Sequence, residues 1–440
     1  MKHKPPAFES WGRYPKVECA VRSLHWTSDF PPSPDALPSA LLPVGMGRSY
    51  GDVCLLEGGT LYRTRGLDRL LSFDPQSGLL RCESGVTLDE ILRFAVPRGW
   101  FLPVTPGTQY VTVGGAIAND VHGKNHHVAG TFGCHVPRLE LVRSDGARLL
   151  CSPTQAPEWF AATVGGMGLT GLITWAEVQL RPIVSRSIRY EAVRFHGLDE
   201  FLALSAGSRS AEYTVAWIDC VSRGRNFARG IYMQGDHSQV PEELHPTPAP
   251  HLAVPFDFPG WVLNRATMRA FNGLYYRKQL RRHVSTLVDY GPFFYPLDKV
   301  LHWNRIYGQR GFLQFQCVLP FASGRDGMEE ILKEITRAGL GSFLAVLKVM
   351  GEVASPGMMS FPMPGITLAL DIPIRPGVTF PLFDRLAEKT RELGGRLYPA
   401  KDARMTAAQF QAFYPQWQRF AGYRDPAFSS SFWERVTADV

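Results

Sequence analysis

Three stretches rich in glycine and other small residues interrupt the first 180 residues of this chain. The first, Gly45–Asp52, directly follows the apolar run Leu41–Val44. The second comprises Thr105–Thr108 and Thr112–His127, and the third is Gly165–Ile173. Glycine permits close backbone approach and exposes consecutive N–H groups, which form concave surfaces suited to a pyrophosphate. A core strand would not use small residues over a dozen positions, so this region is predicted to lay its backbone against a large planar ligand.

The first stretch differs from the dinucleotide fingerprint of parallel α/β folds. It is not G-x-G-x-x-G, and no amphipathic helix follows it. Taken alone, such a stretch is more often a simple turn than a phosphate-binding loop. The second stretch contains His122, His126 and His127, but no Asp, Glu or Cys completes a familiar metal-ligand spacing. Hydrogen bonding of these imidazoles to backbone is the simpler interpretation, so no metal site is predicted.

The residues around these stretches predict short strands. Apolar runs at Leu41–Val44, Leu79–Cys82 and Leu139–Val142 indicate strands, and Asp145-Gly146 indicates a hairpin turn into the strand Arg148–Cys151. Thr87-Leu88-Asp89-Glu90 has the spacing of a capping box. One short helix is therefore expected among the strands of this region.

From about residue 186 the pattern changes to longer strands that alternate with helices. Strands are predicted at Phe312–Leu319 and Phe343–Val349, and helices around Met328–Ile335 and Pro381–Leu393. A second capping box, Thr406-Ala407-Ala408-Gln409, predicts a helix near the C-terminus. The sequence therefore predicts an α+β fold.

The net charge of +7 and the pI of about 9.0 favour anionic partners without requiring nucleic acid. The basic N-terminus, residues 1–6, is not followed by an apolar core, and no run of 18 apolar residues occurs in the chain. We therefore expect no signal peptide and no membrane span, and a cytoplasmic or peripherally membrane-associated protein.

The segment Phe256–Tyr307 is unusual because it holds 12 aromatic residues in 52, while no acidic residue occurs between Phe258 and Val288. Arg277 and Arg281, like Lys278 and Arg282, are four residues apart and are predicted to share a helix face. One interpretation is an aromatic core with a solvated basic face. The other is a lid that contacts an acidic lipid surface or an anionic lipid-linked substrate.

Polar residues within the later strands indicate a second kind of site. In the strand Phe312–Leu319, Gln314 and Gln316 point to one face and are suited to sugar hydroxyls, unless that face is simply exposed. Lys348 lies among apolar neighbours and needs a partner, a lowered pKa or a route to solvent. Lys401 is next to Asp402 and could pair with it at the surface.

The three glycine-rich stretches, in this order, resemble the FAD-binding domain of the vanillyl-alcohol oxidase (PCMH) type. Four further segments extend the resemblance to the family of decaprenylphosphoryl-β-D-ribose oxidases, the flavoprotein half of an arabinose-donor epimerase. These segments are His122–His127, Trp303–Gly308, Phe312–Gln316 and Ala400–Asp402. The resemblance covers about Trp11 to Lys401 and beyond. It implies an FAD-binding domain at 1–185, a substrate domain with an antiparallel sheet flanked by helices at 186–395, and a C-terminal segment, 396–440, that returns to the FAD domain.

The resemblance also implies FAD as cofactor. In many relatives a histidine at the place of Arg48 is joined covalently to the flavin; arginine cannot form that bond, so noncovalent FAD is predicted. The implied cofactor-binding residues are Gly45, Met46, Gly47, Arg48, Ser49, Tyr50, Gly51, Asp52, Gly107, Thr112, Val113, Gly114, Gly115, His122, Gly123, Lys124, Asn125, Ile173 and Tyr398.

The implied reaction is oxidation of the C2 hydroxyl of a polyprenylphosphoryl ribofuranose, the first step of its epimerisation for cell-envelope polysaccharide. Lys401 is the first candidate for the proton-handling group, with His122 and Tyr50 positioning substrate and flavin. A quinone is implied as electron acceptor and a separate NADH-dependent reductase as partner. The implied substrate-binding residues are Tyr307, Gln314, Gln316, Lys348, Lys124 and Thr367.

Two departures from the family pattern occur at Thr367 and Ala369, where mycobacterial members carry asparagine and cysteine. That cysteine is the target of covalent nitroaromatic inhibitors, so this chain is predicted to escape covalent capture. The departures leave two alternatives open. One is an FAD-dependent oxidase of a small polyol or aldonolactone, and the other is a catalytically silent flavin-binding partner protein.

Overall fold

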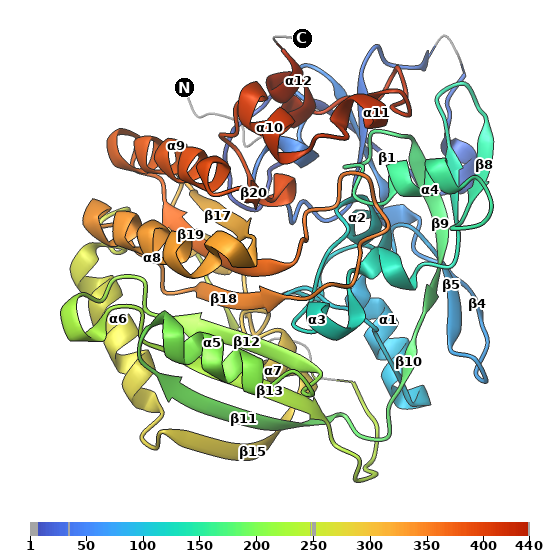
Figure 1. The fold of residues 1–440 in the computed structure, drawn as a ribbon. Helices are drawn as coiled ribbons and strands as arrows, with labels where there is room; N and C mark the ends of the chain where they lie inside the picture. The colour runs from blue at the N-terminus through green and yellow to red at the C-terminus, as the bar shows by residue number, and fades with distance from the viewer. Residues whose placement is uncertain (1–7, 34–35, 247, 249–251, 439–440) are drawn as a thin grey trace.

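The computed structural model describes residues 8–33, 36–246, 248 and 252–438. The N-terminal residues on which the signal-peptide expectation rests, 1–6, lie outside these ranges. The elements of the first 180 residues lie on one side of the molecule, and a large sheet with its helices lies on the other (Figure 1). The fold is α+β, as predicted.

The N-terminal unit contains two main sheets. One is parallel with order β1-β3-β2, and the other is antiparallel with order β4-β5-β9-β7-β8. Four predicted strands are confirmed, including the hairpin β7–β8, whose turn residue Gly146 has a φ of 87°. The strands are β1 (Ala20–Ser23), β2 (Leu41–Val44), β3 (Thr60–Arg63), β4 (Leu70–Phe73), β5 (Leu79–Glu83), β7 (Leu139–Val142), β8 (Arg148–Cys151) and β9 (Leu172–Gln179), with the short pair β6 (Trp100–Phe101) and β10 (Arg181–Pro182).

The predicted capping box begins helix α1 (Leu88–Ala95). The Thr87 N–H donates to the Glu90 carboxylate at 2.7 Å, and the Glu90 N–H donates to the Thr87 hydroxyl at 3.2 Å. The expectation of a single helix in this region is wrong, because three further short helices occur. They are α2 (Val113–Ala118), α3 (His126–Ala129) and α4 (Pro157–Thr163). The first lies inside a glycine-rich stretch, whose low helix propensity concealed it.

The second unit is an antiparallel eight-stranded sheet with order β15-β11-β13-β12-β18-β19-β17-β20. Helices α5 (Gly197–Gly207), α8 (Phe321–Ala338) and α9 (Pro376–Glu392) cover one of its faces (Figure 1). A two-stranded parallel pair, β14 (Leu252–Ala253) and β16 (Val300–Leu301), lies outside the sheet. The strands are β11 (Ser187–Phe195), β12 (Tyr213–Ile218), β13 (Gly230–His237), β15 (His283–Asp289), β17 (Phe312–Leu319), β18 (Ala345–Met350), β19 (Gly365–Pro373) and β20 (Arg396–Leu397).

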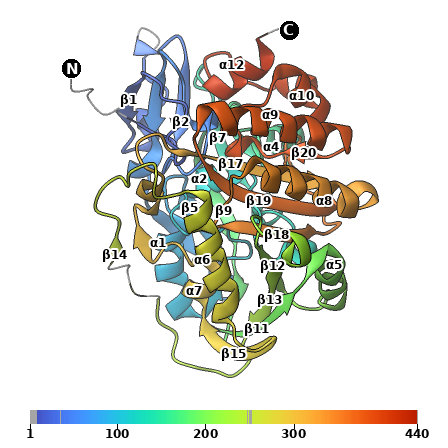
Figure 2. The same ribbon diagram turned by 90° about the vertical axis from the view of Figure 1, so that its left-hand side faces the viewer.

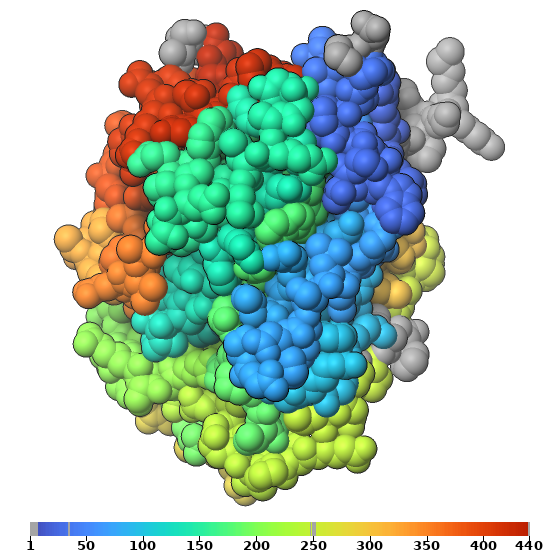
Figure 3. Space-filling model, turned by 90° about the vertical axis from the view of Figure 1, so that its right-hand side faces the viewer, coloured from blue at the N-terminus to red at the C-terminus, as the bar shows by residue number. Residues whose placement is uncertain are grey.

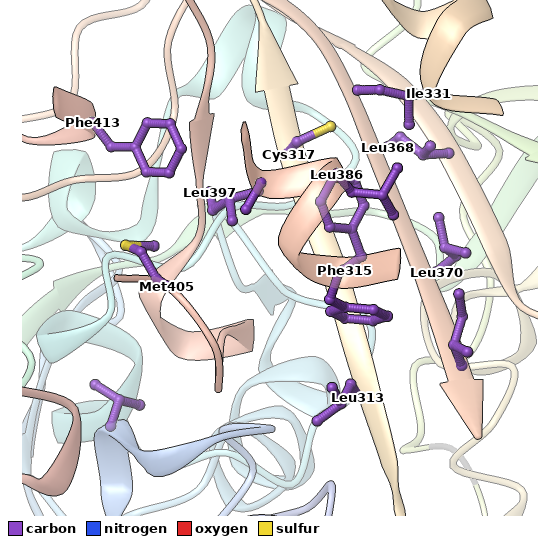
Figure 4. Packing of buried hydrophobic residues seen from close by; sticks show 14 of the residues in the cluster. Leu313, Phe315, Cys317, Ile331, Leu368, Leu370, Leu386, Leu397, Met405 and Phe413 are labelled. Atoms are coloured by element: carbon purple, nitrogen blue, oxygen red, sulfur yellow. The ribbon is translucent and has the colours of Figure 1, made fainter. Parts of the chain in front are cut away.

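Strand β17 separates the hydrophobic core from the other face of the sheet. Leu313, Phe315 and Cys317 point toward the helices and belong to the largest buried cluster (Figure 4). Gln314 and Gln316 are also buried but point away from this core. The predicted alternation is therefore confirmed, and it places two amides on the face that looks toward the N-terminal unit.

Helix α6 (Arg265–Lys278) packs on the side of the sheet away from the helical core, through Tyr276 against Trp217 and Ile231. It ends earlier than predicted: Gln279 has extended backbone, so Arg281 and Arg282 lie beyond the helix and do not share its face. The expected shared face is therefore wrong. Figure 2 looks directly onto α6, with α7 (Tyr290–Phe294) and β15 beside its lower end.

The C-terminal segment first adds β20 to the eight-stranded sheet and then packs against the N-terminal unit. Leu41 forms a parallel bridge with Phe428, and Arg435 donates to Asp52 at 2.8 Å and to Asp402 at 3.0 Å. Figure 3 shows this segment and the first strands at the same end of the molecule. The predicted capping box at Thr406 is confirmed. The helices are α10 (Ala407–Phe413), α11 (Trp417–Ala421) and α12 (Ser431–Thr437).

Among the helices that the structure describes, none has the length and apolar character needed to cross a bilayer.

Candidate active site

A cavity of about 730 Å³ lies between the N-terminal unit and the eight-stranded sheet. Its volume is within the range of ligand-binding cavities, roughly 300–1,000 Å³. One wall comes from the glycine-rich stretches, and the opposite wall comes from β17, β18 and β19. Residues of α6 also reach it, through Tyr275 and Lys278.

Most of the predicted cofactor-binding residues line this cavity. All three glycine-rich stretches contribute, although they are distant in sequence. The lining members of the prediction are Gly45, Met46, Gly47, Arg48, Ser49, Tyr50, Gly107, Thr112, Gly114, Gly115, His122, Gly123, Lys124, Ile173 and Tyr398.

Four predicted cofactor-binding residues do not line the cavity and support its walls instead. A Cβ on Gly51 would lie 1.6 Å from the Asp402 carbonyl, so this glycine permits a close backbone contact. Asp52 forms an ion pair with Arg435. Val113 is fully buried in the core of the N-terminal unit, and Asn125 donates to the Pro103 carbonyl at 2.8 Å.

The cavity suits a large ligand with polar groups. Ser84 Oγ, Asn119 Oδ1 and Thr367 Oγ1 belong to residues that line it, and these buried atoms have no hydrogen-bond partner among the described residues. Buried polar atoms are normally paired, so a ligand that supplies donors or acceptors is expected there. A Cβ on Gly107 would meet no atom within 4 Å, which leaves open space at that wall. The residues present therefore fit FAD.

Arg48 of the first glycine-rich stretch lies at the cavity wall. Its guanidinium donates to the Met46 carbonyl at 3.0 Å and lies 4.2 Å from the centre of the Trp11 ring. Burial lowers its pKa, an effect that nearby Asp298 opposes. The side chain offers the site a cation rather than a nucleophile.

His122 is the centre of a buried hydrogen-bond network. Lys348 Nζ lies 2.9 Å from His122 Nδ1 and 2.5 Å from the Gly123 carbonyl, and the Gln316 amide lies 2.9 Å from His122 Nε2. Burial and the Lys348 charge hold the pKa of His122 well below its usual value. The Gln316 atom closest to the ring is the amide nitrogen, so the amide N–H donates to His122 Nε2, and the proton of neutral His122 lies on Nδ1, toward the Lys348 amine.

Lys348 and Lys124 are buried cations at the same end of the cavity. Burial lowers the pKa of each to about 7, and Lys124 contributes further to the shift of Lys348. Lys124 donates to the carbonyls of Phe293 and Phe294, and its ammonium lies 4.7 Å from the Phe293 ring centre. The surface alternative for Lys348 is excluded, because its side chain is buried.

Lys401 lies above Tyr50, with its ammonium 3.8 Å from the centre of the phenol ring. The Tyr50 N–H donates to the Ala400 carbonyl at 2.9 Å, which fixes the two segments together. Burial lowers the pKa of Lys401, while the charge of Asp371 raises it. The alternative of a surface pair with Asp402 is wrong, because Asp402 is bound by Arg435.

Asp371 is a candidate site residue that the sequence reasoning missed. It is fully buried, and it accepts from the Gln314 amide at 2.5 Å while its Oδ2 has no hydrogen-bond partner in the described part of the chain. Burial raises its pKa, which Lys401 opposes. Period-two spacing from Thr367 through Ala369 reaches Asp371, and this signal could have identified it.

Of three other positions named in the sequence analysis, two line the cavity and one does not. Thr367 and Ala369 line the cavity, as do Gln314, Gln316 and Lys348. Tyr307 is not among the lining residues; it stacks on Phe312 with ring centres 4.1 Å apart. Within the described ranges, no group of three His, Cys, Asp or Glu side chains is arranged to hold a metal ion.

The cavity also has an apolar arm, which the sequence reasoning did not anticipate. It runs along the sheet beneath α6 and is lined by Trp217, Met233, Tyr190, Tyr275 and Val288. Strand β12 is buried on both faces, so alternation in its sequence gives no sign of which side chains face a ligand.

Comparison with known proteins now identifies the family. A family model described as an FAD binding domain matches residues 37–152. The decaprenylphosphoryl-β-D-ribose oxidase of Mycolicibacterium smegmatis is 38% identical over 410 residues, which cover 89% of this chain and 88% of the relative. The chain belongs to the decaprenylphosphoryl-β-D-ribose oxidase family. It is an FAD-binding oxidoreductase, which confirms the predicted family, fold class and cofactor.

Two further relatives match most of the length of this chain. An uncharacterized protein of Streptomyces coelicolor is 31% identical over 363 residues, covering 79% of this chain and 97% of the relative. The L-gulono-1,4-lactone dehydrogenase of Mycobacterium tuberculosis is 24% identical over 389 residues, covering 87% and 85%.

Proposed function

We propose that this chain oxidises the C2 hydroxyl of a polyprenylphosphoryl-β-D-ribofuranose to the 2-keto sugar. One observation carries the proposal: a single cavity joins a glycine-rich cofactor wall, a cluster of amides and lysines, and an apolar arm. These three zones match the flavin, the phosphorylated sugar and the prenyl chain in turn. FAD, when bound, supplies the acceptor for the hydride that leaves the sugar carbon.

Lys401 receives the hydroxyl proton in this proposal. Its burial favours the neutral amine, which can accept a proton near neutral pH. The Asp371 carboxylate then stabilises the resulting ammonium. Asp371 also orients Gln314, because the amide N–H₂ donates to the carboxylate and the amide oxygen is left for the sugar.

The neighbouring residues bind and orient the sugar phosphate. Gln316 is held by His122, and His122 is held by Lys348, so the three side chains form a preorganised group. The lowered pKa values of Lys124 and Lys348 report the cost of burying two cations without an anion. A bound phosphate would supply that anion and favour the charged lysines.

In this proposal residues 1–185 and 396–440 hold the cofactor, and residues 186–395 hold the substrate. FAD is bound noncovalently, since Arg48 replaces the linking histidine. Acid precipitation should therefore leave the yellow colour in the supernatant, and colour in the pellet would contradict this. A quinone reoxidises the flavin, and a separate NADH-dependent reductase completes the epimerisation.

Anaerobic flavin bleaching tests the reaction. Loss of flavin absorbance with a prenylphosphoryl ribose, and none with free ribose, supports the proposal. Bleaching by free sugars or lactones alone would overturn it. Retained FAD with no bleaching by any donor would indicate a catalytically silent partner protein.

The length of the similarity to the lactone dehydrogenase favours oxidation of a small aldonolactone as second candidate. The apolar arm distinguishes the two, because a small polar substrate leaves it unfilled. Equal kcat/KM for prenylated and unprenylated substrates would favour the second candidate.

A further inference from the structure

Exposed hydrophobic side chains are concentrated in α6 and the segments that flank it in the sequence. Of the 17 large hydrophobic residues that are exposed in the described part of the chain, eight lie between residues 252 and 301. Leu280 is 86% exposed, Trp261 74% and Leu274 69%. Single exposed apolar residues are ordinary, but a cluster of this kind marks an interaction surface. The members are Leu252, Phe256, Trp261, Phe271, Leu274, Leu280, Leu287 and Leu301.

The same surface is strongly basic. Between residues 258 and 288 there are six lysines and arginines and no acidic residue. Arg282 is paired with Glu200, but no salt bridge within the described ranges engages Arg265, Arg269, Arg277, Lys278 or Arg281. These five side chains are exposed. The partner that complements this surface therefore carries negative charge beside apolar groups.

Helix α6 is held firmly from its inner side. Asn272 is fully buried and donates to Asp219 at 3.0 Å and to the Ser342 carbonyl at 3.1 Å. Met268, Asn272 and Tyr276 recur at four-residue spacing and form the buried stripe. Leu274 and Arg277 lie off this stripe and are exposed. The 14-residue helix is about 21 Å long, which suits a helix that lies along an interface.

The apolar arm of the cavity reaches this helix. Tyr275 and Lys278 of α6 line the cavity, together with Val288 and Leu301. Phe271, which is exposed, stacks on Tyr275 with ring centres 6.2 Å apart. A prenyl chain in the arm would therefore emerge beside the exposed hydrophobic residues.

We propose that the exposed residues of α6 and its flanking segments, the α6 surface, dock this protein on an anionic lipid bilayer. The proposal rests on the proposed function, because a membrane-embedded prenyl phosphate has to reach the cavity from the bilayer. The leucines and tryptophan insert into the interfacial region, and the unpaired cations meet lipid phosphates. The sugar phosphate then enters the cavity while its chain stays near the lipid.

Vesicle flotation of the FAD-loaded protein tests the surface. We expect binding to vesicles that contain one-third phosphatidylglycerol and at least about tenfold weaker binding to phosphatidylcholine alone. Leu274→Glu/Leu280→Glu and Arg277→Glu/Arg281→Glu should each weaken binding about tenfold or more. Leu71→Glu is the matched control, since Leu71 is exposed on β4, on the opposite side of Figure 1, and should bind like the parent.

Three outcomes overturn the docking surface: no binding to anionic vesicles, equal binding to both vesicle types, or equal loss in the Leu71→Glu control. A dimer that Leu274→Glu dissociates, with no vesicle binding, would assign the surface to a second copy instead. Flavin bleaching by a short-chain prenylphosphoryl ribose without vesicles is measured in parallel. Bleaching without vesicle binding refutes only the docking surface, and vesicle binding without bleaching refutes only the proposed function.

Discussion

The two walls of the cavity are built in opposite ways. The N-terminal wall meets the ligand space largely with backbone, through glycines such as Gly45, Gly107 and Gly114. The wall formed by the sheet meets it with the side chains of Gln314, Gln316 and other polar residues of β17–β19. The first wall leaves room for a ligand because its glycines have no side chains. The second wall contacts a ligand through side chains that point into the cavity. Substitutions should therefore damage the first by adding atoms and the second by removing them.

The largest effect is expected where the two walls meet, at Lys401. Lys401→Met keeps most of the side-chain volume over Tyr50 but removes the proton acceptor. The rate of flavin reduction by the ribose substrate should fall about thousandfold, while FAD content stays unchanged. Stopped-flow absorbance under anaerobic conditions measures this rate. The control Lys299→Met removes an exposed lysine and should reduce flavin at the parental rate; parental reduction in Lys401→Met as well would remove Lys401 from the mechanism.

The two faces of β17 provide the next comparison. Phe315→Ala opens a hole in the core beneath α9 and should lower the free energy of unfolding by about 3–4 kcal/mol. Gln316→Ala, one residue along on the cavity face, should cost no more than about 1 kcal/mol. Denaturant unfolding of the holoprotein measures both. If both variants lose a similar free energy of unfolding, side chains on the cavity face of the sheet also contribute to its packing.

Adding atoms to the N-terminal wall should displace the cofactor. Gly107→Leu projects a side chain into open space in the cavity, and FAD affinity should fall roughly tenfold to hundredfold. Gly207→Leu is the matched control, because Gly207 is equally open and also exposed but lies on α5 and does not line the cavity. Fluorescence titration of FAD gives both affinities. Unchanged affinity in Gly107→Leu would place the cofactor elsewhere.

The smallest expected effect concerns Asp371 and the pH dependence of flavin reduction. The reaction needs neutral Lys401, so its rate should rise as the pH passes upward through the pKa of that lysine. The Asp371 charge raises this pKa, so Asp371→Asn should move the rising limb to lower pH, by about 1 pH unit. Asp298→Asn removes a different buried carboxyl, one that lines the cavity, and should leave the limb in place. If the rising limb of the pH profile does not shift in Asp371→Asn, the Asp371 charge does not affect the pKa of Lys401.

The sequence predicted the parts of the molecule whose signals are local. Capping boxes such as Thr87–Glu90 are confirmed, as are the strands β2 and β17, because neighbouring residues determine them. The glycine-rich stretches predicted a ligand wall, and the structure brings them together. The expected helix face shared by Arg277 and Arg281 was wrong because nothing near Gln279 in the sequence signals a stop. The helix ends there, and the Gln279 amide donates to the Ala192 carbonyl of β11.

The parts that could not be predicted depend on pairing between distant segments. The apolar arm requires the register of β12 and β13, which no local pattern reveals. Asp371 faces the amides only because β19 pairs with β17 so that Gln314 lies opposite it. Gly51 and Asp52 matched the family's segment, yet the structure uses them to hold Asp402 and Arg435. A matching motif therefore does not show which of its members face the ligand.

The ties between the two chain ends have a consequence for biosynthesis. The hydrogen bond from the Tyr50 N–H to the Ala400 carbonyl positions the neighbouring Lys401. Arg435 of α12 donates to Asp402 in the same loop and so holds it in place. A nascent chain that still lacks α12 has made both cavity walls but not the clamp that joins them. A chain still being synthesised can therefore close this clamp only after α12 has left the ribosome.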